Sequence, residues 1–207
     1  MTPEQEDLFA SVFRGDTESL RRRLQDVEPE QIENLLSGSD EVGRSALIVG
    51  GLLGRTAAVT ELTTYGAQVN QQTERGYTAL HLASCWGHVD TVQTLLKLGA
   101  DPKVQNFRGE CPVDLARKYS RIDCEKCLIL GEAKQDFASY LAHIKGVISE
   151  SAASLTKDER NLSSHVLAAK TEWLQTVTDP QVSDFTDQRR SLDDSLQHIF
   201  NKLNLRT

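Results

Sequence analysis

Residues 76–101 read GYTALHLASCWGHVDTVQTLLKLGAD, and their landmarks recur when the chain is shifted back by 33 residues. The matching glycines, alanines and aliphatic residues are Gly43, Ala46, Leu47, Gly54, Val59, Leu62, Gly66 and Ala67. Self-similarity at a fixed period of about 20 to 50 residues is typical of a solenoid, in which each unit buries its apolar face against the next. The period therefore predicts a stack of repeats.

The quoted unit predicts two antiparallel helices after a tight turn. Gly76 suits a turn residue with positive φ, Thr78 suits a helix N-cap, and Gly99 suits a left-handed helix end. The predicted apolar faces of the two helices consist of Leu80, Ala83, Val92, Leu95 and Leu96.

The flanking copies are degraded. A forward shift finds Gly109, but Ser120 replaces the second glycine and Asp114 replaces the histidine. Upstream, residues 11–24 predict an incomplete first unit that caps the stack, followed by an insertion of about six residues. We therefore expect N-terminal capping helices over residues 1–39 and repeats over residues 40–133.

The run Thr78-Ala79-Leu80-His81, followed by Gly87-His88 and Gly99-Ala100-Asp101, resembles the ankyrin repeat. The resemblance implies that the ring of His81 bonds between neighbouring hairpins and that His88 is structural. It also implies that the hairpin tips and the last residues of each first helix line a concave, protein-binding groove.

Transferred by the 33-residue period, the resemblance assigns the groove two sets of candidate contact residues. The turn set is Arg44, Arg75, Tyr77, Arg108 and Glu110, and the helix-end set is Leu52, Leu53, Cys85, Trp86, Lys118 and Tyr119. Two interpretations of Trp86 and Tyr119 remain open. They pack against each other across repeats, or they form a contact patch, since Trp, Tyr and Arg are common interface anchors.

Residues 134–207 predict an antiparallel helical bundle, so that the whole chain is all-α. A first helix carries Phe137, Tyr140, Leu141, Ile144, Val147 and Ile148. A capping box, Thr156 to Glu159, opens a second helix, which carries Leu162, Val166, Ala169 and Trp173. A third, with Asp179 as N-cap and Pro180 as its first residue, carries the stripe Val182, Phe185, Arg189, Leu192, Leu196, Ile199 and Leu203.

This tail resembles the helical lid of the seventy-kilodalton heat-shock chaperones over residues 137–205, through Tyr140, Glu172-Trp173-Leu174 and Arg189-Arg190 in that order. Ankyrin units followed by such a tail resemble a family of two-part ankyrin-repeat proteins. That resemblance implies a cytoplasmic, non-enzymatic protein associated with microtubule-based structures such as cilia or the division midbody. The alternative is a chaperone-linked module, whose tail docks on heat-shock chaperone machinery.

Composition narrows the function further. The net charge of -7 argues against nucleic acid as the main partner, because phosphate binding needs a basic surface. No apolar run is long enough to span a membrane and the first residues are acidic, so we expect a soluble, intracellular protein. No phosphate loop, nucleophile elbow or metal-ligand triad occurs, which predicts no enzyme activity and no cofactor.

The cysteines offer one alternative to a purely structural interpretation. Cys124 and Cys127 have the spacing of a zinc or redox pair, to which Cys85 and Cys111 could contribute. We favour small, mildly apolar core residues and therefore predict no metal. The sequence thus predicts an adaptor or scaffold that binds an unidentified, cytoskeletal or axonemal protein partner.

Overall fold

The computed structural model describes residues 2–203, except for the side chain of residue 29. This part contains eleven α-helices, one short 3-10 helix and no strand, which confirms the predicted all-α class. The chain divides between Ile129 and Leu130 into two compact units. Within the described residues, no helix is both long and apolar enough to cross a bilayer.

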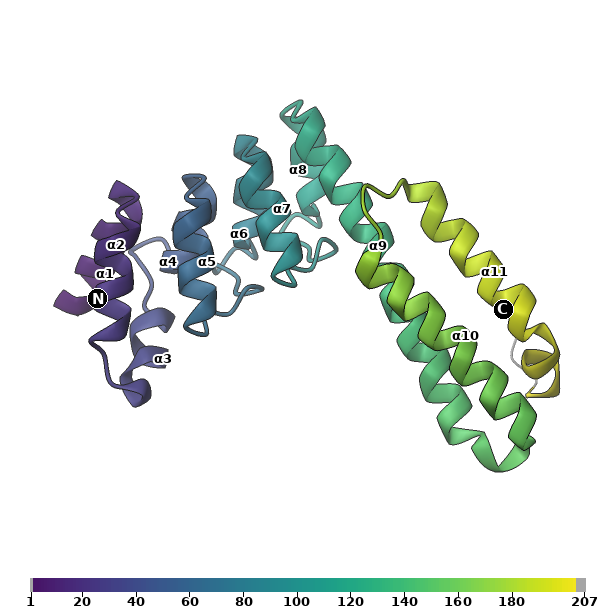
Figure 1. The fold of residues 1–207 in the computed structure, drawn as a ribbon. Coiled ribbons are helices and arrows are strands. Elements are labelled where there is room, and N and C mark those ends of the chain that lie inside the picture. Colours follow the sequence, from purple (N-terminus) through teal and green to yellow (C-terminus); the bar gives the residue numbers. More distant parts are fainter. Residues whose placement is uncertain (1, 204–207) are drawn as a thin grey trace. The chain divides into compact units, whose positions relative to one another are not determined.

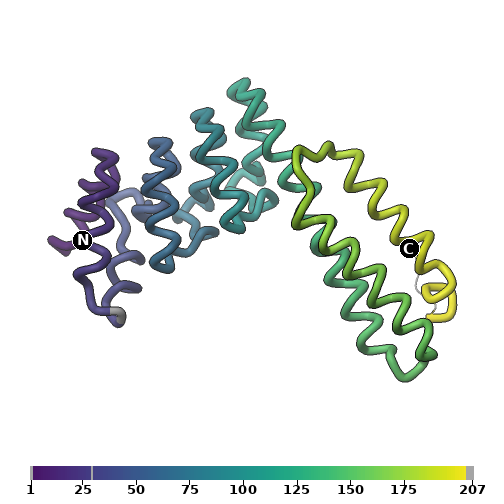
Figure 2. Tube along the Cα trace, viewed as in Figure 1, coloured from purple at the N-terminus to yellow at the C-terminus, as the bar shows by residue number. Residues whose placement is uncertain are grey.

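The helices of the first unit pack in two rows, in which successive pairs follow one another along the chain (Figures 1 and 2). The first row contains α1 (Pro3–Arg14), α4 (Ala46–Leu52), α6 (Ala79–Trp86) and α8 (Pro112–Lys118). The second row contains α2 (Thr17–Gln25), α5 (Thr56–Thr64) and α7 (Val89–Lys97). The predicted insertion forms α3 (Pro29–Ser37), which packs against α1.

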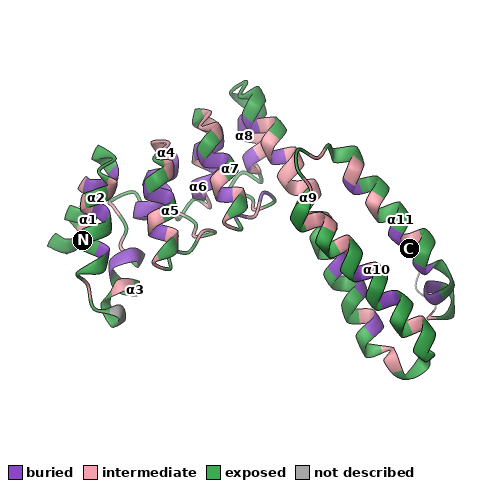
Figure 3. Ribbon diagram, viewed as in Figure 1, coloured by how far each residue is buried: buried purple, intermediate pink, exposed green. Residues whose placement is uncertain are grey.

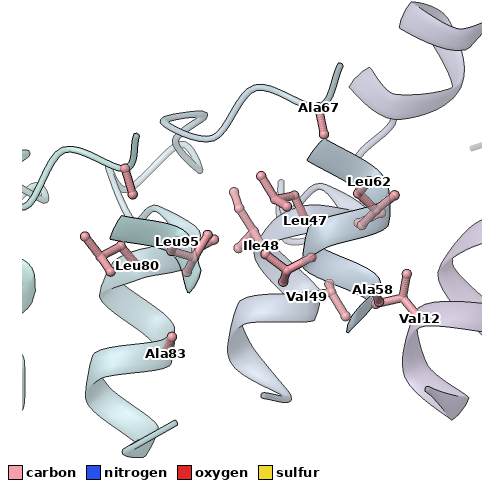
Figure 4. Packing of buried hydrophobic residues seen from close by; sticks show 14 of the residues in the cluster. Val12, Leu47, Ile48, Val49, Ala58, Leu62, Ala67, Leu80, Ala83 and Leu95 are labelled. Carbon is pink, nitrogen blue, oxygen red and sulfur yellow. The ribbon is translucent and has the colours of Figure 1, made fainter. Parts of the chain in front are cut away.

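Apolar side chains fill the space between these rows. Figure 4 shows Val12 from α1, Val49 from α4 and Ala58 from α5 close together, and Leu80 from α6 beside Leu95 from α7. The buried residues lie on the faces that the helices turn toward one another (Figure 3). Each pair therefore depends on its neighbours to remove its apolar face from water.

The first-row helices α4 and α6 approach closely at Gly51. A Cβ atom at this position would lie 2.6 Å from the carbonyl oxygen of Ala79. Only a residue without a side chain permits this contact between the two backbones.

The start of α6 is held by a capping box and by a bridge to the next hairpin. The Thr78 N–H donates to Nδ1 of His81 over 3.2 Å, so the Nε2–H of this ring is the donor to the Glu110 carbonyl oxygen, 3.1 Å away. His81 is completely buried, and this burial lowers the pKa of its imidazole below 6.5. The predicted role of His81 between hairpins is confirmed.

The third repeat, in which several landmark residues are replaced, keeps the backbone geometry of the other repeats. Ser120 adopts a φ of 55° at the position that glycine occupies elsewhere. Asp114 accepts a hydrogen bond from the Cys111 N–H over 2.9 Å, so it caps α8 as His81 caps α6. Cys111 and Pro112 begin that helix as N-cap and first residue.

The long helix α9 (Ile122–Glu150) begins in the first unit and ends in the second. The predicted boundary at residues 133/134 lies inside it, and the helix expected from residue 137 onward is its continuation. The division of the chain at residues 39/40 and 133/134 stays a prediction.

In the second unit, residues 130–150 of α9 pack with α10 (Lys157–Thr176) and α11 (Val182–Lys202), and the 3-10 turn Ala152–Ser154 joins α9 to α10. Trp173 meets Phe137 and Phe185 edge-on, with ring centroids 5.8 and 5.4 Å away. Leu192, Leu196 and Ile199 of α11 are fully buried or nearly so. This core confirms the predicted bundle.

Three details of the predicted bundle are wrong. Helix α11 begins at Val182 with Gln181 as N-cap, because Asp184 accepts a hydrogen bond from the Gln181 N–H, and Asp179 lies outside the helix with a φ of 52°. Val182, the first residue of the predicted stripe, is 41% exposed. On α10, Leu162 and Ala169 are exposed, and the inward face runs through Ser163 and Leu167.

Polar contacts also join the helices of this bundle. The guanidinium of Arg189, which interrupts the apolar stripe of α11, lies 4.1 Å from the centroid of the Tyr140 ring, and the Tyr140 hydroxyl donates to Asp193. Glu159, in the capping box of α10, accepts from Lys202 over 2.8 Å. The Lys202 ammonium and the Thr156 N–H hold the pKa of Glu159 at about 2.

Truncating Leu196 to Ala should lower the free energy of unfolding of the second unit by about 2–5 kcal/mol, because it leaves a cavity in the bundle core. Denaturant unfolding followed by Trp173 fluorescence measures this change. Leu162→Ala on the exposed face of α10 is the matched control and should unfold almost as the wild type. Equal unfolding of the two variants would show that the register of α11 is wrong.

Acidification should destabilise the first unit through His81. Its folded pKa lies below the reference 6.5, so between these two values the unfolded chain binds more protons and stability falls as the pH is lowered. Urea unfolding between about pH 5 and pH 7 tests this, because His81→Gln should show a shallower pH dependence than wild type. Parallel pH profiles would contradict the assignment of a neutral imidazole.

Candidate functional site

Three equivalent turns present the candidate residues of the hairpins. In each, the first residue pairs with the fifth through a backbone hydrogen bond: Asp40 with Arg44, Thr73 with Tyr77, and Asn106 with Glu110. The glycine at the fourth position has a positive φ in all three turns. The 33-residue period thus places Arg75 and Arg108 at the same position of two successive turns.

The second and third turns are in direct backbone contact. The Phe107 N–H donates to the Arg75 carbonyl oxygen over 3.0 Å. A Cβ atom on Gly76 would lie 3.0 Å from Cα of Asn106, so a side chain at this position would push the turns apart. Gly76 is therefore required both by its φ of 75° and by this close approach.

Aromatic rings gather at this junction. The Tyr77 ring lies edge-on to His81 and to Phe107, with centroids 5.8 and 6.2 Å away. Phe107 is 58% exposed, and the Arg108 guanidinium carbon lies 5.1 Å from its centroid. Phe107 is not among the contact residues predicted from the sequence, although the 33-residue period aligns it with the polar Glu74 and marks it as an unusual turn residue.

The helix ends supply the second set of candidates. Trp86, the last residue of α6, is 57% exposed and Tyr119, after α8, is 49% exposed. Among the described residues these two rings form no pair, which favours an accessible patch over mutual packing. Leu52 and Leu53 are only half-buried, and Leu53 packs partly against the core.

A salt bridge connects the end of α8 to the third turn. The Lys118 ammonium lies 2.8 Å from a carboxylate oxygen of Glu110, and Glu110 also accepts from the Asn106 amide over 3.0 Å. These contacts lower the pKa of Glu110, Lys118 contributing most. Cys85 of α6 lies within the electrostatic influence of both charged groups, and its burial raises the pKa of its thiol. The Lys118–Glu110 pair thus joins the end of α8 to the third turn.

We call the candidate contact set the groove face. It consists of nine of the predicted contact residues, without Cys85 and Glu110, and of the exposed Phe107. The nine are Arg44, Leu52, Leu53, Arg75, Tyr77, Trp86, Arg108, Lys118 and Tyr119. Exposed aromatic rings and arginines suit it to protein recognition.

The remaining histidines and cysteines lie outside this surface or serve the core. His88 Nε2 lies 3.0 Å from the Leu52 carbonyl oxygen and so joins two repeats. Cys124 packs in the hydrophobic core, and its burial raises the pKa of its thiol to about 11. Among the described residues, no three His, Cys, Asp or Glu side chains are placed to hold a metal ion.

Two pockets lie away from the groove face. One, of about 400 Å³, lies between α3 and residues 65–71. The other, of about 590 Å³, lies between α9 and α10 in the second unit and is floored by Ile148 and Leu167. Neither contains a histidine or a cysteine among its lining residues, and neither includes any predicted contact residue.

Stacked helix pairs, left-handed glycine turns and the His81 bridge define an ankyrin-repeat protein. A family profile described as ankyrin repeats (3 copies) matches residues 8–106. Comparison with curated proteins extends the likeness over nearly the whole chain. The matching proteins are all named ankyrin repeat domain-containing protein 45.

The human protein is 33% identical over 95% of this chain and 76% of its own length. The zebrafish protein is 35% identical, over 97% of this chain and 93% of its own length. The mouse protein is 39% identical, over 98% of this chain and 84% of its own length. The chain therefore belongs to the ankyrin repeat domain-containing protein 45 family.

Purified protein should carry no stoichiometric zinc, because the thiol of Cys124 is buried in an apolar core where ionisation is disfavoured. Elemental analysis measures the zinc content. A chelator should leave the helical circular-dichroism signal unchanged, whereas a structural zinc site would couple metal loss to unfolding. One zinc ion per chain would overturn this prediction.

Proposed function

We propose that this chain is a non-enzymatic adaptor or scaffold that binds a protein partner on the groove face. The observation that carries the proposal is the exposure of three large aromatic residues of the groove face, Trp86, Phe107 and Tyr119. Their burial by a partner would remove apolar area from water at about 25 cal/mol per Å². The rings of Trp and Tyr also lose little conformational freedom on binding.

The role of the ankyrin units as a protein-interaction module supports this assignment. The surface is rigid where contact is proposed, because Phe107 and Tyr77 lie on turns joined by backbone hydrogen bonds and Trp86 ends a capped helix. A pre-organised surface loses less entropy when it binds. The groove face therefore supports binding without a folding step.

The finer expectations concern which partner is bound and where. Three expectations stay predictions from the sequence resemblances. They are residence in the cytoplasm, association with ciliary or midbody microtubule structures, and docking of the tail on heat-shock chaperones. Proximity labelling with the full chain, compared with a groove variant and a bundle-surface variant, separates them. Loss of cytoskeletal partners from the groove variant supports the adaptor, and loss of chaperones from the bundle variant supports the alternative.

Trp86→Ala should weaken partner binding by about 2 kcal/mol, roughly thirtyfold in affinity, because an exposed interface anchor is removed. Binding of a partner recovered by affinity purification is measured by calorimetry, and stability by thermal unfolding. Leu162→Ala, on the surface of the second unit, is the control and should bind normally. Leu95→Ala, a core change, should instead destabilise the fold.

The opposite pattern contradicts the proposal. If Trp86→Ala unfolds the repeats as Leu95→Ala does, Trp86 belongs to the packing of the stack. If it leaves the affinity of every recovered partner unchanged, the groove face is not where partners bind.

A further inference from the structure

The arginines of the three turns differ in whether they already have an acidic partner. Arg44 is paired within its own turn, where its Nε and Nη2 atoms lie 2.7 and 2.6 Å from one oxygen of Asp40. Arg75 and Arg108 are both exposed, and neither forms an ion pair with another described residue. The second and third turns therefore present two cations whose charge is not neutralised by direct contact.

Two carboxylates of these turns contact other groups directly. Glu110 is bound to Lys118 and to the Asn106 amide. Glu74 lies against the preceding turn, where its Cγ atom would be 3.5 Å from a Cβ on Gly43. Arg108 still acts through space on the Glu110 carboxylate, but among the described residues neither Arg75 nor Arg108 has a direct carboxylate partner, although the chain as a whole carries a charge of -7.

The rings beside these arginines add an apolar element. The Arg108 guanidinium lies over the exposed ring of Phe107, and the Tyr77 ring meets that ring edge-on. Stacking uses the face of the guanidinium, and its N–H donors point outward in the plane of the group. A carboxylate can therefore reach those donors in a bidentate geometry while an apolar side chain covers Phe107 and Tyr77.

From this arrangement we infer that the junction of the second and third turns, formed by Arg75, Tyr77, Phe107 and Arg108, binds an acidic protein segment that carries a large apolar side chain. This inference rests on the proposed function and names the chemistry of the partner. The apolar side chain packs on Phe107 and Tyr77, and flanking carboxylates bind Arg75 and Arg108. Backbone contact between the turns holds the two cations on neighbouring supports.

The test selects peptides without bias toward charge. A phage-displayed library of random peptides is selected on the purified full chain, and the enriched peptides are synthesised and measured by fluorescence anisotropy. We expect enrichment of peptides in which an aromatic or large aliphatic residue is flanked by Asp or Glu. Their affinity should fall about tenfold or more in the double variant Arg75→Gln, Arg108→Gln, and also as salt is raised.

Arg23→Gln is the matched control, because this arginine lies on α2, outside the groove face, and is already paired with Asp7, so its loss should leave peptide affinity nearly unchanged. Phe107→Ala should weaken the same peptides without changing their preference for acidic residues. Circular dichroism of each variant confirms that the repeats remain folded, since all four side chains of the junction are at least partly exposed.

Several results would overturn the inference. They are enrichment of basic or uncharged peptides, failure to enrich any peptide, and a loss of affinity in the Arg23→Gln control equal to that in the Arg75→Gln, Arg108→Gln double variant. Peptides or partners that depend on Trp86 but not on Arg75 and Arg108 would overturn the acidic preference and leave the proposed function standing. If the affinity of every peptide and partner is independent of Trp86 and of the junction arginines, both proposals are wrong.

Discussion

A buried, neutral imidazole links the repeats on which the first unit depends. His81 accepts from the Thr78 N–H with one ring nitrogen and donates to the Glu110 carbonyl with the other, 29 residues further along the chain. One side chain thereby caps its own helix and holds the next hairpin in register. Both bonds use the same neutral tautomer, and the bond to Glu110 restrains the third repeat relative to the second.

That register determines what the surface presents. It brings the turn at Gly76 into backbone contact with the turn at Asn106, and so places Phe107 beside Tyr77. Local contacts decide which basic side chains are neutralised. Arg44 and Lys118 each contact a carboxylate of this chain, whereas Arg75 and Arg108 do not. Internal pairing, rather than the number of basic residues, decides where this acidic protein is positive.

The second unit is held by a different set of interactions. Three aromatic rings from three helices, Phe137, Trp173 and Phe185, form one part of its core, and Trp173 meets the other two edge-on. Glu159 connects the first turn of α10 to the last turn of α11 through Lys202. Sequence spacing predicted the three helices, but α9 is continuous from Ile122 because neither proline nor a left-handed residue interrupts it.

The sequence by itself determined the repeat period, the helix pairs and the left-handed turns, because these depend on local spacing and on residue types with few conformational options. The role of His81 between hairpins was implied by the resemblance to ankyrin repeats. Only the tertiary structure decided which arginines are paired, that Trp86 and Tyr119 stand apart, and that Phe107 joins the groove face. The same holds for Leu162, which has a suitable spacing and yet faces water. Such properties depend on contacts with residues from distant parts of the chain. The spacing of residues along the sequence does not give the distances between them in space.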